Sequence, residues 1–235
     1  MRARQRHFNP AHAGATAAFD ARFGIAVADN AAVDTWSNRT GTNDATQATS
    51  TWRPTFKATG GSNNTPALLF DGTTDTLGHS ISLTTAPALV MSVAVRTGGS
   101  GFQTLAAFMP PNTANFNIMY GRWDPTANWG FAPSDSGQSI LNTWTICSAV
   151  PNSTATSNST TTMWSNGANE VTTAAGSRFA GDVSDRRAIG ATTSAGEAHL
   201  TGSISQVVMI PATVGDPLRR RLERAAGYSF KIACS

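Results

Sequence analysis

The chain has 235 residues, carries a formal net charge of +3, and is 40% hydrophobic but only 13% charged. This length suits one large β domain, and the scarcity of Glu and Lys argues against a helical bundle. No segment approaches the run of about 18 apolar residues that a membrane-spanning helix needs. The densest arginine clusters lie near the two ends of the chain, and no basic face with interleaved aromatic side chains lies between them, which argues against a nucleic-acid partner.

Residues 1–15 are predicted to form a polar arm that precedes a single domain at residues 16–235. Pro10 and Gly14 interrupt any helix in this segment, and its arginines repel one another, so we expect the arm to order only against a partner. The segment also lacks the apolar run of a secretory signal, which predicts a protein kept in the cytosol until it assembles or is released. The docking residues that we assign to the arm are Arg2, Arg4, Arg6 and Phe8.

Short strands and turns are predicted for the first half of the domain. Apolar patches there alternate with acidic and amide side chains, at residues 17–27, 32–36 and 52–56. The apolar strand at residues 67–70 ends in a tight turn that contains two carboxylates. Side chains alternate in polarity through residues 77–83, which predicts a strand with His79 at the surface or at a sheet edge.

The second half repeats this pattern at intervals of about 8 to 12 residues, the spacing typical of a β-sandwich. The dipeptide Asn166-Gly167 lies between two β-prone runs and predicts a tight hairpin. Strands are predicted at residues 88–96, 102–108, 115–122, 129–132, 144–150, 161–164, 170–173, 187–190 and 202–210.

One helix is predicted near the C-terminus, at residues 217–226. Asp216 can cap its first turn, Pro217 suits the first helical position, and Gly227 can end it in the left-handed conformation. An apolar stripe at helical spacing is formed by Leu218, Leu222 and Ala225. Alternation resumes at residues 228–232, which predicts a final strand.

The two cysteines, Cys147 and Cys234, are too few for a disulfide framework and lack metal-ligand spacing. We expect two free thiols, with a single bridge between them as the alternative.

Three separated blocks of sequence carry a resemblance to a known family. The first block comprises residues 36–41 (WSNRTG), 45–47 (ATQ), 53–55 (RPT) and 66–75 (PALLFDGTTD), the second comprises residues 144–146 (WTI) and 163–167 (MWSNG), and the third runs from residues 202–209 (GSISQVVM) through the helix to Gly227 and Tyr228. Together they resemble the concanavalin A-like lectin/glucanase superfamily in its laminin-G-like form, which is common in phage structural proteins and bacterial surface proteins. The resemblance implies an all-β, two-sheet antiparallel jelly-roll sandwich with one short C-terminal helix.

The sequence argues against a catalytic centre. Retaining glycosidases need two carboxyl groups roughly 5 to 5.5 Å apart, but Glu170, Glu197 and Glu223 are widely separated. On the predicted helix, Glu223 is expected to pair with Arg219 or Arg220. We therefore predict that the protein is not an enzyme, with a degenerate hydrolase as a minor alternative.

Two sets of residues are candidates for binding. Asp71 and Asp75 lie across a short turn and could hold Ca²⁺, as in some laminin-G-like relatives, although a turn that the Asp side chains stabilise is the alternative; no other cofactor is predicted. Four aromatic residues could stack on a sugar, with burial in the core as the alternative for most of them. These are Trp52, Tyr120, Trp123 and Trp129.

The first functional hypothesis is a virion structural protein: a capsid decoration, head-fibre or tail-associated lectin-like module. It would dock on capsid or tail proteins of the same particle, adhere to a cell-surface glycan, and form a homo-oligomer on a symmetric shell. The chain's own Met1, the missing export signal and the family resemblance motivate it. The alternative is a carbohydrate-binding module of a bacterial surface or secreted protein, located outside the cell.

Overall fold

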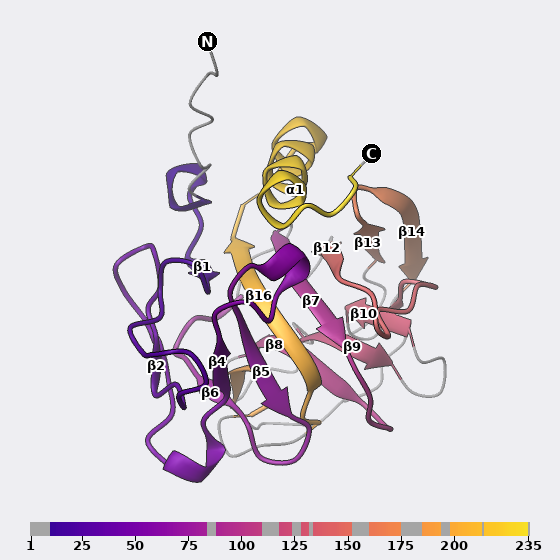
Figure 1. Ribbon diagram of the computed structural model, residues 1–235. Helices are drawn as coiled ribbons and strands as arrows, with labels where there is room; N and C mark the ends of the chain where they lie inside the picture. Colours follow the sequence, from indigo (N-terminus) through magenta and orange to yellow (C-terminus); the bar gives the residue numbers. More distant parts are fainter. Residues whose placement is uncertain are drawn as a thin grey trace.

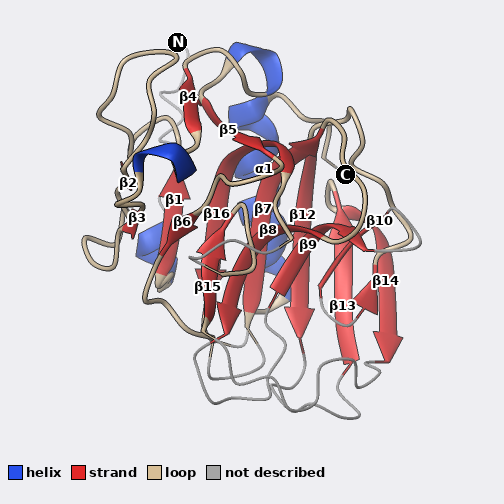
Figure 2. Cartoon of the chain, turned by 90° about the horizontal axis from the view of Figure 1, so that it is seen from below, coloured by secondary structure: helices blue, strands red, loops and turns tan. Residues whose placement is uncertain are grey.

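Two antiparallel sheets face each other and form the predicted sandwich, so the all-β prediction is confirmed (Figures 1 and 2). The computed structural model describes residues 10–83, 88–109, 118–123, 128–131, 134–151, 160–174, 185–193, 198–212 and 214–234. Within this part of the chain, each sheet contains eight strands.

The first sheet has its longest strands at its centre. Strand β1 (Ala17–Asp20) lies beside β16, along the edge that β5 also uses. The other strands follow one another across the sheet in the order β14 (Ala168–Ala174), β13 (Thr160–Ser165), β12 (Thr145–Pro151), β7 (Leu89–Arg96), β16 (Thr201–Ile210), β5 (Ala67–Asp71) and β4 (Thr55–Lys57).

The second sheet brings together strands that are far apart in the sequence. Its order is β11 (Ser134–Asp135), β10 (Asn128–Phe131), β9 (Ile118–Trp123), β8 (Gln103–Met109), β15 (Arg186–Ile189), β6 (Leu77–Gly78), β3 (Ala45–Thr46) and β2 (Thr35–Trp36). Three short 3-10 helices are described outside the sheets, namely η1 (Pro10–Ala13), η2 (Ser50–Trp52) and η3 (Ser62–Asn64).

Successive side chains of β7 pack alternately into two separate cores. Val90 and Ala94 face the core between the sheets, whereas Leu89, Met91 and Val93 face the helix α1 (Asp216–Phe230) on the outer side. Figure 1 shows α1 across this outer face. Because both faces of the strand are covered, its sequence is an almost continuous apolar run instead of a polar and apolar alternation.

The helix is longer than the sequence predicts, and the final strand predicted at residues 228–232 is wrong. Helix α1 continues to Phe230, and Lys231 takes the left-handed conformation that was expected of Gly227. Phe230 is fully buried one turn beyond Ala226, on the face that packs against the first sheet. Burial of this ring therefore favours a further turn of helix over a strand. Among the described residues, no helix is both long and apolar enough to cross a bilayer.

Two local predictions for helix α1 have different outcomes. The expected cap at Asp216 is wrong, because the N-cap is Gly215 and makes no side-chain hydrogen bond. Asp216 lies in the first turn and pairs with Arg219 and Arg220. The expected partner of Glu223 is confirmed as Arg219, at 2.6 Å between Nη1 and Oε2, and both side chains are buried.

The hairpin at Asn166-Gly167 is confirmed and joins β13 to β14. Asn166 and Gly167 have φ angles of 53° and 79°, the positive values that a tight hairpin turn of this kind requires. The Asn166 side chain also accepts a hydrogen bond from the backbone N–H of Ile146 at 2.8 Å. The turn is therefore tied to the neighbouring strand β12.

Both cysteines are free thiols. Cys147 lies in the core between the sheets, whereas Cys234 packs against the core beneath α1. Since the two thiols belong to cores on opposite faces of the first sheet, the alternative of a bridge is excluded by their placement.

The predicted N-terminal arm is only partly described. Its candidate docking residues, Arg2, Arg4, Arg6 and Phe8, lie outside the described residues, so that role stays a prediction. The last residue of the predicted arm, Ala15, is buried in the core beneath α1, and the next residue, Thr16, donates its N–H to the carbonyl of Met209 at 2.9 Å.

Candidate functional site

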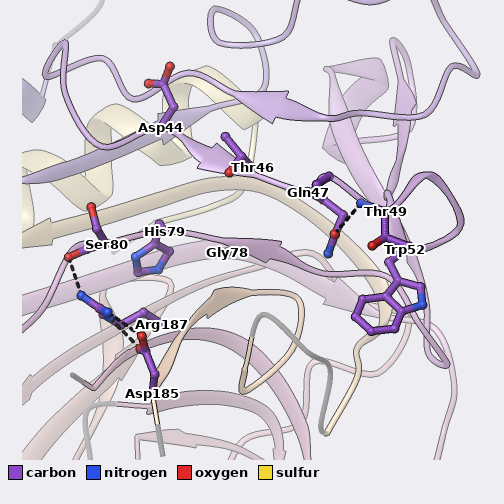
Figure 3. A pocket seen from close by; sticks show the side chains of 11 residues that line it. Asp44, Thr46, Gln47, Thr49, Trp52, Gly78, His79, Ser80, Asp185 and Arg187 are labelled. Carbon is purple, nitrogen blue, oxygen red and sulfur yellow. Dashed lines mark hydrogen bonds and ion pairs between the residues drawn. The ribbon is translucent and has the colours of Figure 1, made fainter. Parts of the chain in front are cut away.

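A groove of about 580 Å³ crosses β3, β6 and β15, three neighbouring strands of the second sheet (Figure 3). Its volume lies in the range typical of small-ligand sites. Figure 3 shows Trp52 at one end of the groove and Ser80 at the other. The other residues that line it are Asp44, Thr46, Gln47, Ala48, Thr49, Gly78, His79, Asp185 and Arg187.

The segment that carries Trp52 is held by hydrogen bonds at several points. The buried amide of Gln47 donates to the carbonyl of Thr76 at 3.3 Å and accepts from the N–H of Thr49 at 3.0 Å. The carbonyl of Trp52 itself accepts from the N–H of Thr76 at 2.9 Å. The half-buried indole of Trp52 is therefore presented at the groove by an anchored backbone.

Arg187 and Asp185 form a bidentate ion pair in the groove. The Arg187 Nε and Nη2 donate to the two carboxylate oxygens of Asp185, at 2.7 and 2.5 Å, and Nη1 donates to the carbonyl of Ser80 at 3.0 Å. The hydrogen bonds to Asp185 raise the pKa of Arg187. All three guanidinium nitrogens are thus engaged within the protein.

His79 lines the groove but is mostly buried, with 9% of its surface exposed, so the prediction of a surface or edge position is wrong. Its ring lies against Phe19 and Phe108, at centroid distances of 6.2 and 5.2 Å. Burial, with the nearby charge of Arg187, lowers the pKa of His79 to about 3. The strand predicted around it shortens to Leu77 and Gly78 in β6.

The hydrogen bonding of His79 also settles its tautomer. Nδ1 accepts from the N–H of Ile81 at 3.2 Å, so the proton of the neutral ring is on Nε2. Nε2 is buried and has no hydrogen-bond partner among the described residues. His79 therefore contributes an uncharged ring to the floor of the groove.

The turn with Asp71 and Asp75 lies directly behind the Trp52 segment. The Oδ1 atom of Asp71 accepts from the backbone N–H groups of Thr73, Thr74 and Asp75, and Oδ2 of Asp75 accepts from the N–H of Asp71 at 3.0 Å. The Thr74 hydroxyl donates to the carbonyl of Thr51 at 3.1 Å. Through this bond the turn supports the wall of the groove.

The two carboxyl groups of the turn differ in protonation. Burial, together with the charge of Asp71, raises the pKa of Asp75 to about 7. Burial would also raise the pKa of Asp71, but hydrogen bonds from Thr73, Thr74 and Asp75 outweigh it and lower that pKa. Both side chains thus act as turn-stabilising groups, which was the alternative to Ca²⁺ binding.

The calcium site itself stays a prediction. In the described part of the chain, no three His, Cys, Asp or Glu side chains gather closely enough to hold a metal ion. A site at this turn would therefore depend on carbonyl groups or water for most of its ligands.

The four aromatic candidates have different positions. Trp129 and Tyr120 are buried, and the Trp129 Nε1 donates to the hydroxyl of Ser165 at 2.9 Å, so a ligand cannot reach these two rings. They take the core position that was weighed as the alternative. The side chain of Trp123 lies outside the described residues. Trp52 lines the groove.

The sequence analysis did not identify the polar residues of the groove. Gln47, Asp185 and Arg187 come from segments separated by more than half the chain. Only the pairing of β6 with both β3 and β15 brings them together. A local signal existed at Asp185 and Arg187, because an acidic and a basic residue two positions apart along an extended segment can form an ion pair.

Solved structures similar to this chain come from carbohydrate-active enzymes. The chain is similar to the Trypanosoma rangeli sialidase in complex with sialic acid, at 15% identity and a TM-score of 0.58, over 95% of this chain and 34% of the sialidase chain. It is similar to domain 4 of AbnA, a GH43 extracellular arabinanase from Geobacillus stearothermophilus, in complex with arabinotriose, at 14% identity and a TM-score of 0.52, over 90% of this chain and 98% of that domain. An arabinofuranosidase complexed with arabinofuranosyl-α-1,2-xylobiose is similar at 12% identity and a TM-score of 0.51, over 86% of this chain and 51% of the other.

These similarities establish a shared β-sandwich fold. The chain spans about a third of the length of the sialidase. No protein-family model matches the sequence, and no curated protein sequence matches it. The comparisons support the sandwich implied by the family resemblance but give no support to a phage structural protein.

The prediction that the protein is not an enzyme is contradicted. The similar structures are a sialidase, a domain of an arabinanase and an arabinofuranosidase, so this sandwich is a fold that glycosidases contain. The prediction depended on carboxylates recognised along the sequence, and a sequence pattern does not reveal which carboxylates the tertiary structure brings together. We correct it to a glycosidase-like fold.

Proposed function

We propose that this sandwich is a carbohydrate-binding module of the kind found within carbohydrate-active proteins, and that the groove at Trp52 binds the glycan. The observation that carries the proposal is the groove itself, where a half-buried indole is combined with carboxylate, guanidinium and hydroxyl groups. An aromatic ring provides an apolar face for the C–H groups of a sugar, and polar side chains around it bind the hydroxyls.

The similarity to domain 4 of the arabinanase adds support. That domain is matched over nearly all of its length and was solved in complex with arabinotriose. The proposal follows the second sequence-based hypothesis, which the similar structures favour over a virion role. Secretion or surface attachment, homo-oligomer formation and docking through the arm stay predictions.

A glycan array followed by titration calorimetry tests the proposal. The wild-type chain is expected to bind at least one oligosaccharide saturably, and Trp52→Ala is expected to weaken binding at least about tenfold, since removing a central aromatic contact typically costs more than about 1 kcal/mol. Tyr228→Ala is the matched control, because Tyr228 is 64% exposed on α1 and does not line the groove.

The absence of binding across a broad array would overturn the proposal. So would binding that Trp52→Ala leaves unchanged while thermal melts show a folded variant. Release of new reducing ends from a bound oligosaccharide, abolished in Asp44→Asn or Asp185→Asn, would show that the groove also cleaves the glycan that it binds.

A further inference from the structure

The charged groups of the groove do not cancel. Asp44 and Asp185 contribute two carboxylates, whereas Arg187 contributes one guanidinium. His79 adds no charge at neutral pH, because burial lowers its pKa to about 3. Among the described residues that line it, the groove therefore has one net negative charge.

Many polar groups of the groove are bonded within the protein. Arg187 donates from Nε and Nη2 to Asp185 and from Nη1 to the carbonyl of Ser80, which uses three of its five N–H groups. Both ends of the Gln47 amide are bonded to the backbone. The hydroxyl of Ser80 donates to the side-chain oxygen of Asn43 at 2.8 Å.

The charged groups most open to a ligand are acceptors, because Asp44 and Asp185 are more exposed than Arg187. The carboxylate of Asp44 is exposed, and its Oδ1 accepts from the N–H of Asn38 at 2.8 Å. Ionised carboxylates can only accept hydrogen bonds, and each has lone pairs beyond those used here. The hydroxyls of Thr46 and Thr49 can donate or accept, so they do not discriminate between ligands.

We infer that this groove selects uncharged glycans over acidic ones, because its lining carries a net negative charge, its exposed carboxylates offer lone pairs to sugar hydroxyls, and Asp185 occupies the Nε/Nη2 fork of its one guanidinium. The inference rests on the proposed function and specifies the class of glycan. A neutral sugar supplies hydroxyl donors to Asp44 and Asp185. A sialic or uronic acid would bring a third carboxylate to a site that is already net negative, and like charges at close range repel.

Binding to Arg187 would not offset the repulsion of an acidic glycan. Carboxylates bind arginine best through two parallel hydrogen bonds, the geometry that Asp185 occupies. To use this Nε/Nη2 fork, a ligand carboxylate would have to displace Asp185 and leave that carboxylate without its partner. Asp185 therefore competes with acidic ligands for Arg187.

Matched pairs of glycans test the inference. The first pair is lactose and 3′-sialyllactose. The second pair is neutral arabino- and galacto-oligosaccharides and oligogalacturonates of the same length. Both pairs are titrated at low ionic strength, because salt screens the repulsion. Neutral members are expected to bind, and acidic members at least about tenfold more weakly. In Asp44→Asn, the affinity for the acidic members should rise by about fivefold, the effect of removing one nearby charge.

Asp185→Asn provides a second, independent arm, because it removes one carboxylate and also frees the Arg187 fork. It should raise the affinity for acidic glycans more than Asp44→Asn does. Asp29→Asn is the matched control, since Asp29 is exposed and lies outside the groove. Thermal melts verify that each variant is folded, and the exposed Asp44 keeps the test available if Asp185→Asn unfolds.

The possible failures are distinguishable. Acidic glycans that bind the wild type as tightly as neutral ones, through a site that Trp52→Ala abolishes, would overturn the inference and leave the proposed function intact. An unchanged preference in both Asp44→Asn and Asp185→Asn would also overturn it. Binding of neither class, or binding insensitive to Trp52→Ala, would overturn the proposed function instead.

Discussion

The carboxyl group of Asp75 should make the protein less stable as the pH rises through neutrality. Burial and the neighbouring charge of Asp71 raise the pKa of Asp75 to about 7 in the folded protein, against an ordinary value of 3.8. The folded chain therefore holds a proton that the unfolded chain releases. This stabilising contribution is complete below the ordinary pKa and is lost as the pH rises through about 7.

The size of the effect follows from the shift. One pKa unit corresponds to about 1.36 kcal/mol, so the free energy of unfolding should fall by about 2 to 3 kcal/mol between about pH 5 and about pH 8. Asp75→Asn cannot ionise and keeps an oxygen for the N–H of Asp71. Its stability should stay nearly constant across this window and exceed that of the wild type at about pH 8 by up to about 4 kcal/mol, which corresponds to the full pKa shift.

Urea denaturation followed by tryptophan fluorescence at a series of pH values measures this difference. Asp71→Asn should reduce this loss without abolishing it, because burial, the larger cause, still raises the pKa of Asp75 after the charge of Asp71 that also raises it is removed. The reasoning is refuted if wild type and Asp75→Asn lose stability in parallel between about pH 5 and about pH 8.

Two further predictions concern packing, and urea denaturation tests both. Gly190→Ala should destabilise by more than about 2 kcal/mol, because Gly190 has a φ of 79° and an added Cβ would lie 2.0 Å from the Phe70 ring. Gly14→Ala has a similar φ of 80° with nothing within 4 Å, so it should cost only about 1 kcal/mol, and equal losses would contradict the role of the ring. Phe230→Ala should cost about 3 to 5 kcal/mol, because the ring is fully buried between α1 and the first sheet. Tyr228 is exposed, so Tyr228→Ala should change stability by less than about 0.5 kcal/mol. A small loss in Phe230→Ala would contradict the observed end of the helix.

Features that depend on neighbouring residues could be predicted from the sequence. The apolar runs of β7 and β16 identify buried strands, and Asn166-Gly167 identifies a hairpin, because only a few residues adopt positive φ angles readily. The Arg219 and Glu223 pair follows from helical spacing alone. In each case the interacting groups lie within a few positions of one another.

Features that depend on distant contacts could not be predicted. Helix α1 continues past Gly227 because the first sheet offers an apolar face to Phe230, and no local signal reveals that face. His79 has the sequence context of a surface residue, yet the tertiary structure places its ring against Phe19 and Phe108.

The groove illustrates the same division most clearly. The sequence by itself determined an all-β sandwich, its hairpins, its C-terminal helix and Trp52 as an aromatic candidate, since side-chain periodicity and turn chemistry are local properties. Only the tertiary structure decided that Trp52 shares a groove with Asp44, Asp185 and Arg187, and that Tyr120 and Trp129 are buried. The physical reason is that strand pairing joins segments more than a hundred residues apart, and their polar side chains form a site only after that pairing exists.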